Sequence, residues 1–236
     1  MSILSDLQTK KLGLFKLIAL GYDLYLKHFR SFFILLCLML PFSIIFQILS
    51  LNIPLNSILF IPLSIYYSFY IFVIIPTYVM AIFIFTEGYV LEENPQFDVV
   101  IRKILPRIIP FIGLSLRYII GYFLRLLLFF VPGIIYSVNN GYCAIAFVLR
   151  DQRGKAAFQY SRSLVKGNWW KVFFFTMLVL TTNFGLEILT STVLNSITTN
   201  FPILVTVLSS ILTSLVSVGV GISGVLLFLN LDFQKQ

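Results

Sequence analysis

Six long apolar segments constrain this chain more than any other feature of its sequence. They cover residues 32–51, 58–85, 108–130, 132–149, 172–189 and 201–229. A helix needs roughly 20 apolar residues to cross a hydrocarbon core about 30 Å thick. Hydrophobic residues make up 59% of the chain and charged residues only 11%, whereas soluble domains are about 25% charged. The sequence therefore predicts an all-α, polytopic membrane protein with six transmembrane helices in one membrane domain, residues 1–236.

The distribution of the basic residues predicts the orientation of these helices in the membrane. Of the seventeen Lys and Arg residues, all except Arg117 and Arg125 lie in segments 1–31, 87–107, 150–171 and 230–236. The alternate connections, around 51–57, 130–132 and 190–200, carry no Lys or Arg. Cytoplasmic loops of membrane proteins carry an excess of these residues. We therefore expect both termini and the charged segments on the cytoplasmic side.

Three of the charged segments have the pattern of amphipathic helices. In residues 5–30, 96–105 and 154–167, charged and apolar side chains separate at steps of three and four. Such helices lie in the headgroup plane with basic residues toward anionic lipid, so membrane lipids are the expected partners. Each precedes two apolar segments, which suggests three units of one helix and one hairpin. The alternative is that ordinary basic loops between membrane helices look mildly amphipathic.

Prolines and glycines mark expected interruptions of the helices. Ends or kinks are predicted at Pro54, Pro62, Pro76, Pro110 and Pro132, because proline removes a helical hydrogen bond and clashes with the preceding turn. The third and fourth segments touch each other. We therefore expect residues 131–133 to form the turn between them.

Arg117 is the main candidate for an intramembrane polar site. Counted from Arg107 at about 1.5 Å per residue, it lies roughly 15 Å deep, near the midplane. An arginine there costs at least about 2.5 kcal/mol and requires a partner, water or a function. It could bind an anion or a lipid phosphate, or carry protons, or it could pair with a polar group of another helix. The candidate partners are Asn139, Asn140, Asn183, Gln47 and Glu187.

Two further groups of polar residues have plain structural interpretations. Asn139 and Asn140 interrupt the fourth segment, where they could hydrogen-bond between helices. The acidic group Glu87, Glu92, Glu93 and Asp98 is typical of a solvated turn.

No pattern in the sequence indicates catalysis or a bound cofactor. His28 is the single histidine, and Cys37 and Cys143 have no His or Cys neighbours at metal-binding spacing. There is no glycine-rich phosphate loop. The net charge is +8, and the basic residues that produce it lie in segments next to the apolar ones. Anionic lipid headgroups are therefore nearer partners than nucleic acid. We expect no enzyme activity, no cofactor, no metal and no nucleic-acid partner.

One stretch of the chain resembles a known family. Its features are a turn into a membrane helix, an acid at the helix end and an amphipathic segment, carried by Pro132, Gly133, Asp151, Ala157, Ser161 and Leu164. This order resembles the YciC-like family of bacterial inner-membrane proteins. That family is related to the membrane domain attached to some glycerophosphoryl diester phosphodiesterases. In this chain Arg150 stands at the usual acidic position, with Asp151 beside it.

The resemblance implies a multi-pass protein of the bacterial inner membrane and no catalytic part within these 236 residues. Two roles fit such a protein. The first is a non-enzymatic structural, scaffolding or accessory module of the envelope, with a protein partner or a second copy of itself. The alternative is a small transporter or lipid-handling protein that uses Arg117. Water access to Arg117 distinguishes permeation from a dry site.

Overall fold

The computed structural model describes residues 3–9, 11–54, 57–197 and 202–235, and these residues form helices and no strands. The first half contains α1 (Ile3–Thr9), α2 (Leu14–Lys27), α3 (Phe29–Asn52), α4 (Phe60–Phe69), η1 (Tyr70–Ile74), α5 (Ile75–Val90) and α6 (Phe97–Ile104). The second half contains η2 (Leu105–Arg107), α7 (Ile108–Leu128), α8 (Phe130–Asn140), α9 (Cys143–Arg150), α10 (Lys155–Val165), α11 (Trp169–Ile197) and α12 (Pro202–Phe233). The all-α prediction is confirmed.

Six helical runs are long and apolar enough to cross a membrane, as the sequence predicts. They are Phe29–Ser50, Phe60–Val90, Phe97–Leu128, Phe130–Arg150, Trp169–Leu194 and Ile203–Phe233. Length and composition thus identify a multi-pass membrane protein. The predicted start of the last segment at residue 201, and parts of the connections predicted around 51–57 and 190–200, lie outside the described residues.

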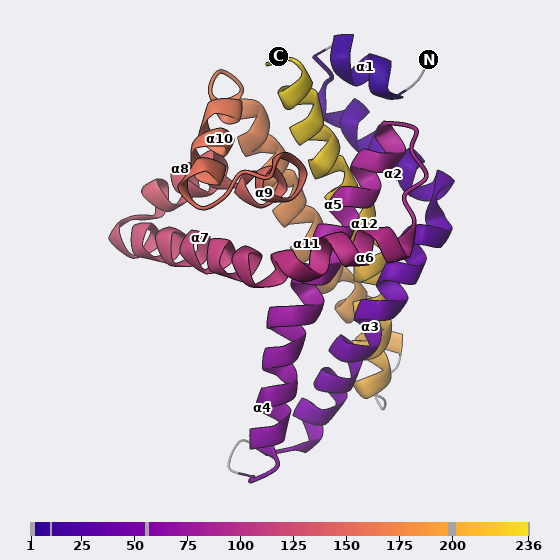
Figure 1. Ribbon diagram of the computed structural model, residues 1–236. Helices are drawn as coiled ribbons and strands as arrows, with labels where there is room; N and C mark the ends of the chain where they lie inside the picture. Colours follow the sequence, from indigo (N-terminus) through magenta and orange to yellow (C-terminus); the bar gives the residue numbers. More distant parts are fainter. Residues whose placement is uncertain (1–2, 10, 55–56, 198–201, 236) are drawn as a thin grey trace.

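The packed core lies at one end of the molecule. Figure 1 shows the two termini together at this end, where α12 contacts α1, α2, α5 and α10. Side chains in the last part of α12, such as Leu226, Phe228 and Leu229, are fully buried. At the opposite end, α3, α4, α11 and α12 expose many of their large apolar side chains. The charge-rich half therefore carries the core, and the apolar half presents surface suited to lipid.

The third and fourth runs take a different course from the other four. In Figure 1, α7 runs across the long axes of α3, α4 and α12, and α8 returns beside it. The turn between them lies at Phe129, which is extended (φ −165°, ψ 151°), while residues 131–133 already belong to α8. The predicted turn at 131–133 is therefore wrong by a few residues. Gly133 permits the close return, since an added Cβ would lie 3.3 Å from the Leu126 Cα.

The predicted fourth segment, 132–149, is two helices and not one. A turn at Gly141 and Tyr142 separates α8 from α9. The Asn140 Nδ2 donates to the carbonyl of Tyr136 at 2.8 Å, and the backbone N–H of Tyr142 donates to Ser161 Oγ at 3.2 Å. Side chains thus satisfy backbone groups that a continuous helix would pair internally.

The prolines are mostly accommodated at helix starts. Pro62, Pro110 and Pro132 each lie in the first turn of a helix, where a missing N–H costs nothing. Pro76 instead lies inside the continuous run Phe60–Val90, directly after the π-helical turn η1. Such single-turn bulges absorb a lost backbone bond inside a helix, so Pro76 does not end the run.

Short helices occupy the three segments predicted as amphipathic. The first, 5–30, is divided, because α1 ends at Thr9 and α2 begins at Leu14. The second and third correspond to α6 and α10. A short helix followed by two apolar runs thus occurs three times along the chain, but the second hairpin, α7 with α8, lies across the other two (Figure 1).

Helices α2 and α12 pack closely against each other in the core. The α carbon of Gly21 faces Ser223 of α12, and a Cβ added there would lie 2.9 Å from the Ser223 backbone nitrogen. Close approach through glycine and serine is the usual way in which membrane helices associate.

We predict that Gly21→Ala destabilises the protein by about 1–3 kcal/mol, because the added methyl group forces α2 away from α12. Thermal unfolding of the full chain in detergent, followed by circular dichroism, measures this effect. Gly221→Ala is the control on the same pair of helices, since nothing lies within 4 Å of its added Cβ; it should be neutral or slightly stabilising. Equal melting temperatures for the two variants would contradict the proposed close contact.

Candidate functional site

A cavity of about 660 Å³ lies between α7, α8 and α10. Its wall combines cationic, aliphatic and aromatic side chains with two glycines. The lining residues are Gly113, Leu116, Arg117, Ile120, Gly121, Arg125, Tyr136, Lys155, Phe158, Gln159 and Arg162. The volume falls in the range of small-molecule binding sites, about 300–1,000 Å³.

Four cations and no acid line this cavity. The cations are Arg117 and Arg125 of α7 with Lys155 and Arg162 of α10. None of the four forms an ion pair with any acidic side chain in the part of the chain that the structure describes. The cavity therefore carries a local positive charge that the surrounding protein leaves uncompensated.

Tyr136 and Gly121 position Arg125. The Arg125 Nη1 donates to the carbonyl of Gly121 at 2.8 Å, and its Cζ lies 4.1 Å from the centroid of the Tyr136 ring. Such a cation–π contact is worth about 0.5–2 kcal/mol. An added Cβ at Gly121 would lie 2.7 Å from the Tyr136 Cζ, so glycine is required where the ring packs on α7. Neither contact neutralises the guanidinium.

Asn140 positions Arg162. Its side chain is 1% exposed, and its Oδ1 accepts a hydrogen bond from the Arg162 Nε at 2.9 Å. Asn140 is therefore the buried helix-packing residue that the sequence indicates, and its partner is Arg162, not Arg117. The Arg162 side chain is exposed at the cavity.

Ser161 joins α10 to the turn between α8 and α9. Its hydroxyl donates to the carbonyl of Asn139 at 2.9 Å while accepting from the Tyr142 N–H. Asn139 thus contributes its backbone, not its side chain, to the contact. Ala157 and Leu164 are buried on the same side of α10. These residues of the family-like stretch pack α10 and thereby place its cations.

Arg117 forms none of the pairs expected from the sequence. Within the described residues it makes no hydrogen bond or ion pair, and its Nη1 lies near Gly154, just before α10. Asn183 instead accepts from Ser217 at 2.5 Å, and Gln47 accepts from Ser210 at 2.9 Å. The buried pair considered for Arg117 is therefore absent from the described part of the chain.

The expected depth of Arg117 also changes. The value near the midplane assumes that the third segment runs straight across the membrane from Arg107. In the structure α7 runs across the other long helices (Figure 1), and Arg117 shares a cavity with Lys155 of α10. The position of α10, not a residue count along α7, therefore decides how deep Arg117 lies.

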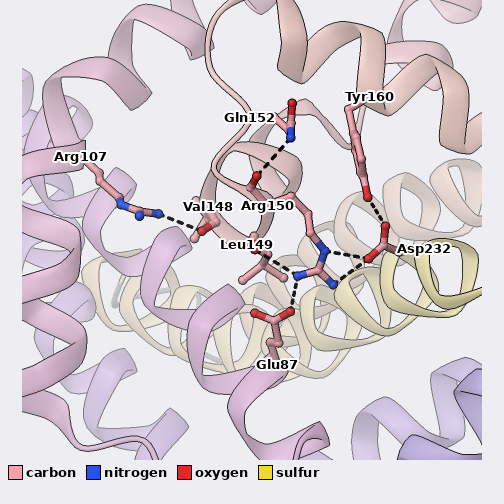
Figure 2. Close-up of polar contacts among 8 residues, drawn as sticks. All are labelled: Glu87, Arg107, Val148, Leu149, Arg150, Gln152, Tyr160 and Asp232. Carbon is pink, nitrogen blue, oxygen red and sulfur yellow. Dashed lines mark hydrogen bonds and ion pairs between the residues drawn. The ribbon is translucent and has the colours of Figure 1, made fainter. Parts of the chain in front are cut away.

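A second polar cluster anchors α9 and α10 to the rest of the protein (Figure 2). The Arg150 Nη1 lies 2.5 Å from the Glu87 Oε1, and its Nη2 and Nε both lie 2.7 Å from the Asp232 Oδ2. The hydroxyl of Tyr160 donates to the other oxygen of Asp232. One guanidinium thus joins the ends of α5, α9 and α12, and Asp232 connects them to α10.

Asp232 is the most buried acid of this cluster, with a side chain 1% exposed. A buried carboxylate must be paired and hydrogen-bonded, and Arg150 with Tyr160 provides both. Loss of hydration and the neighbouring Asp232 carboxylate raise the pKa of Tyr160 to about 12. The phenol therefore stays protonated at physiological pH and continues to donate its hydrogen bond.

The end of α9 is capped by side chains (Figure 2). The Arg107 Nη1 donates to the carbonyl of Val148 at 3.0 Å, and Arg150 donates to the carbonyl of Leu149 at 3.0 Å. Cations at a helix C-terminus satisfy its free carbonyls and its dipole. Asp151 follows in a left-handed conformation (φ 49°) and lies 3.5 Å from Arg107.

The sequence interpretation missed this cluster. The sequence predicts a solvated turn for the acidic group that includes Glu87, but the Glu87 side chain is largely buried against Arg150. Asp151, the acid of the family-like stretch, is exposed, and Arg150 beside it makes the buried contacts. The one available signal was that Glu87, Arg150 and Asp232 each end an apolar run on the side predicted to be cytoplasmic.

Comparisons with known proteins were made by family model, by sequence and by structure. No family model, no curated protein and no solved structure matches the chain. The resemblance to the YciC-like family therefore remains a prediction from the sequence.

We predict that Arg150→Gln destabilises the protein by about 3–5 kcal/mol, because it leaves the buried carboxylate of Asp232 without its counter-ion. Chemical or thermal unfolding in detergent measures the loss. Arg153→Gln is the control, since Arg153 is 68% exposed and lies 3.5 Å from the exposed Asp151; surface pairs of this kind contribute at most about 1 kcal/mol. If the two variants lost equal stability, the anchoring role of Arg150 would be wrong.

Proposed function

We propose that this protein is a lipid-handling membrane protein that binds the phosphate of an anionic lipid headgroup in the cavity between α7, α8 and α10. The observation that carries this proposal is the set of four cations, without an acid among them, that line one cavity of about 660 Å³. Of the two roles expected from the sequence, this charge favours lipid handling over a purely structural module.

Uncompensated charge favours an anionic ligand. Like charges that line one cavity repel each other, and this repulsion grows as the local dielectric constant falls. A bound phosphate replaces this repulsion with charge-assisted hydrogen bonds, and the planar guanidinium groups of Arg117 and Arg162 match its geometry. Asn140 and Tyr136 already hold two of the cations in place.

The apolar wall of the cavity favours a lipid over a free anion. Leu116, Ile120 and Phe158 line the same cavity as the cations. Leu116 and Ile120 continue into the exposed apolar surface of α7. A lipid carries a phosphate next to hydrocarbon. Its phosphate can therefore contact the cations of the cavity while its hydrocarbon contacts the apolar side chains. Free phosphate would leave the apolar wall without a partner.

The resemblance to the YciC-like family implies the cellular setting, and the basic residues indicate the orientation. We place the protein in a bacterial inner membrane with both termini and the cavity on the cytoplasmic side. Basic residues gather at that side of membrane proteins, and the anionic lipids of the cytoplasmic leaflet attract them by about 1 kcal/mol per residue. Binding and presenting a lipid requires no catalytic group, which agrees with the expectation of no enzyme activity.

We predict that Arg117→Gln and Arg162→Gln each weaken the binding of phosphatidylglycerol about fivefold, from the loss of about 1 kcal/mol per basic residue. Native mass spectrometry of the full chain, titrated with phosphatidylglycerol in a neutral detergent, measures the bound fraction. Arg102→Gln is the matched control, because Arg102 is an exposed arginine of α6 outside the cavity; it should leave the affinity unchanged.

Two further titrations identify the ligand. Phosphatidylcholine, which has no net charge, should bind far more weakly than phosphatidylglycerol, and inorganic phosphate should compete only at much higher concentration. If inorganic phosphate binds tightly while phosphatidylglycerol does not, the ligand is a soluble anion and the lipid proposal is wrong. If Arg102→Gln weakens binding as much as Arg117→Gln, the attraction comes from net charge, and the cavity has no specific role.

A further inference from the structure

The positions of the basic residues in the sequence bear on whether α7 crosses the membrane. Residues 32–86 contain no Lys or Arg, and neither do residues 172–229. All seventeen basic residues lie before, between or after these two stretches. Each stretch contains two of the apolar runs, which makes one membrane hairpin. Arg117 and Arg125 depart from the positive-inside pattern only if α7 itself crosses the membrane.

The cavity places α10 opposite the part of α7 that contains both arginines. Arg117 and Arg125 are eight residues apart, about 12 Å along a helix, and both share the cavity with Lys155 and Arg162. Tyr160 of the same short helix is hydrogen-bonded to Asp232 near the end of α12. Both arginines therefore lie near the end of the molecule that holds the charged network.

The far end of the molecule is formed by other helices. In Figure 1 the ends of α3, α4, α11 and α12 extend away from the termini, while α7 and α8 project sideways from the body. The hairpin of α7 and α8 does not run alongside these four helices toward the far end.

The surface of α7 has two chemically different sides. Arg117 and Arg125 face the cavity beneath α10. Other side chains of α7 are apolar and exposed, from Ile109, which is 82% exposed, to Leu127, which is 88% exposed. Phe129 and Phe130 at the tip of the hairpin are also exposed. A helix with a basic side and a broad apolar side is suited to the interface between headgroups and acyl chains.

We infer that the hairpin of α7 and α8 lies along the membrane surface on the side of the termini, with the apolar side of α7 against the acyl chains. Only α3, the run from α4 to α5, α11 and α12 then cross the membrane. The partner of this apolar surface is the lipid leaflet. The inference explains why Arg117 and Arg125 sit with the other basic residues, and it does not depend on which anion the cavity binds.

Spin labels at the two ends of α7 test this inference. Ile109→Cys and Leu127→Cys are made separately in the full chain carrying Cys37→Ala and Cys143→Ala, and reconstituted into vesicles of phosphatidylcholine and phosphatidylglycerol. Power saturation by oxygen and by a nickel chelate reports the depth of each label. The two positions are 18 residues apart, about 27 Å along a helix. A helix lying along the surface gives the two labels similar depths within one leaflet.

Helix α3 provides the matched control. Phe33→Cys and Leu49→Cys also replace exposed apolar residues, and they are 16 residues apart, about 24 Å along the helix. These labels should report opposite leaflets, which verifies correct insertion. Labels at 109 and 127 that differ in depth by more than about 13 Å, or that lie in opposite leaflets, would show that α7 crosses the membrane and would overturn the inference. All four side chains point away from the core, so the substitutions preserve the fold.

Discussion

The guanidinium of Arg150 is the interaction on which the charged half of the protein depends. It pairs with Glu87 at 2.5 Å and with the buried Asp232 at 2.7 Å. These acids lie in the last turns of α5 and α12. Apolar surfaces alone would let these two helices shift along each other. Because a buried carboxylate without its partner is strongly unfavourable, the contact sets the register of both helices. It also holds α9, a helix of only eight residues, against them.

The contacts of Arg150 and Asp232 also position the helices that line the cavity. Tyr160 connects Asp232 to α10, and Ser161 and Arg162, the next residues, contact Asn139 and Asn140 at the end of α8. Helix α8 in turn packs on α7 through Gly133 and Tyr136. The chain of contacts therefore runs from a cluster of paired charges to a cluster of cations without an acid. The first cluster serves stability, whereas the second leaves its charge available for a ligand.

The sequence predicts the local elements of this site better than their assembly. Arg117, Gly121 and Arg125 lie on one face because helical periodicity alone places them there, and the structure agrees. Asn140 is buried and hydrogen-bonded as proposed, but its partner is Arg162. Glu87 looked like part of a solvated turn, because nothing near it in the sequence reveals Arg150, which is 63 residues away. Long-range pairs of this kind leave no periodic signal.

By itself the sequence determined that this is an all-helical protein with six runs apolar enough for a membrane, because insertion depends on the composition of each run and not on its neighbours. It also predicts that the basic residues lie on one side of the membrane. Only the tertiary structure decided that α7 runs across the other helices and that four of the cations meet in one cavity. Hydropathy measures how apolar a helix is, whereas its direction depends on what it packs against.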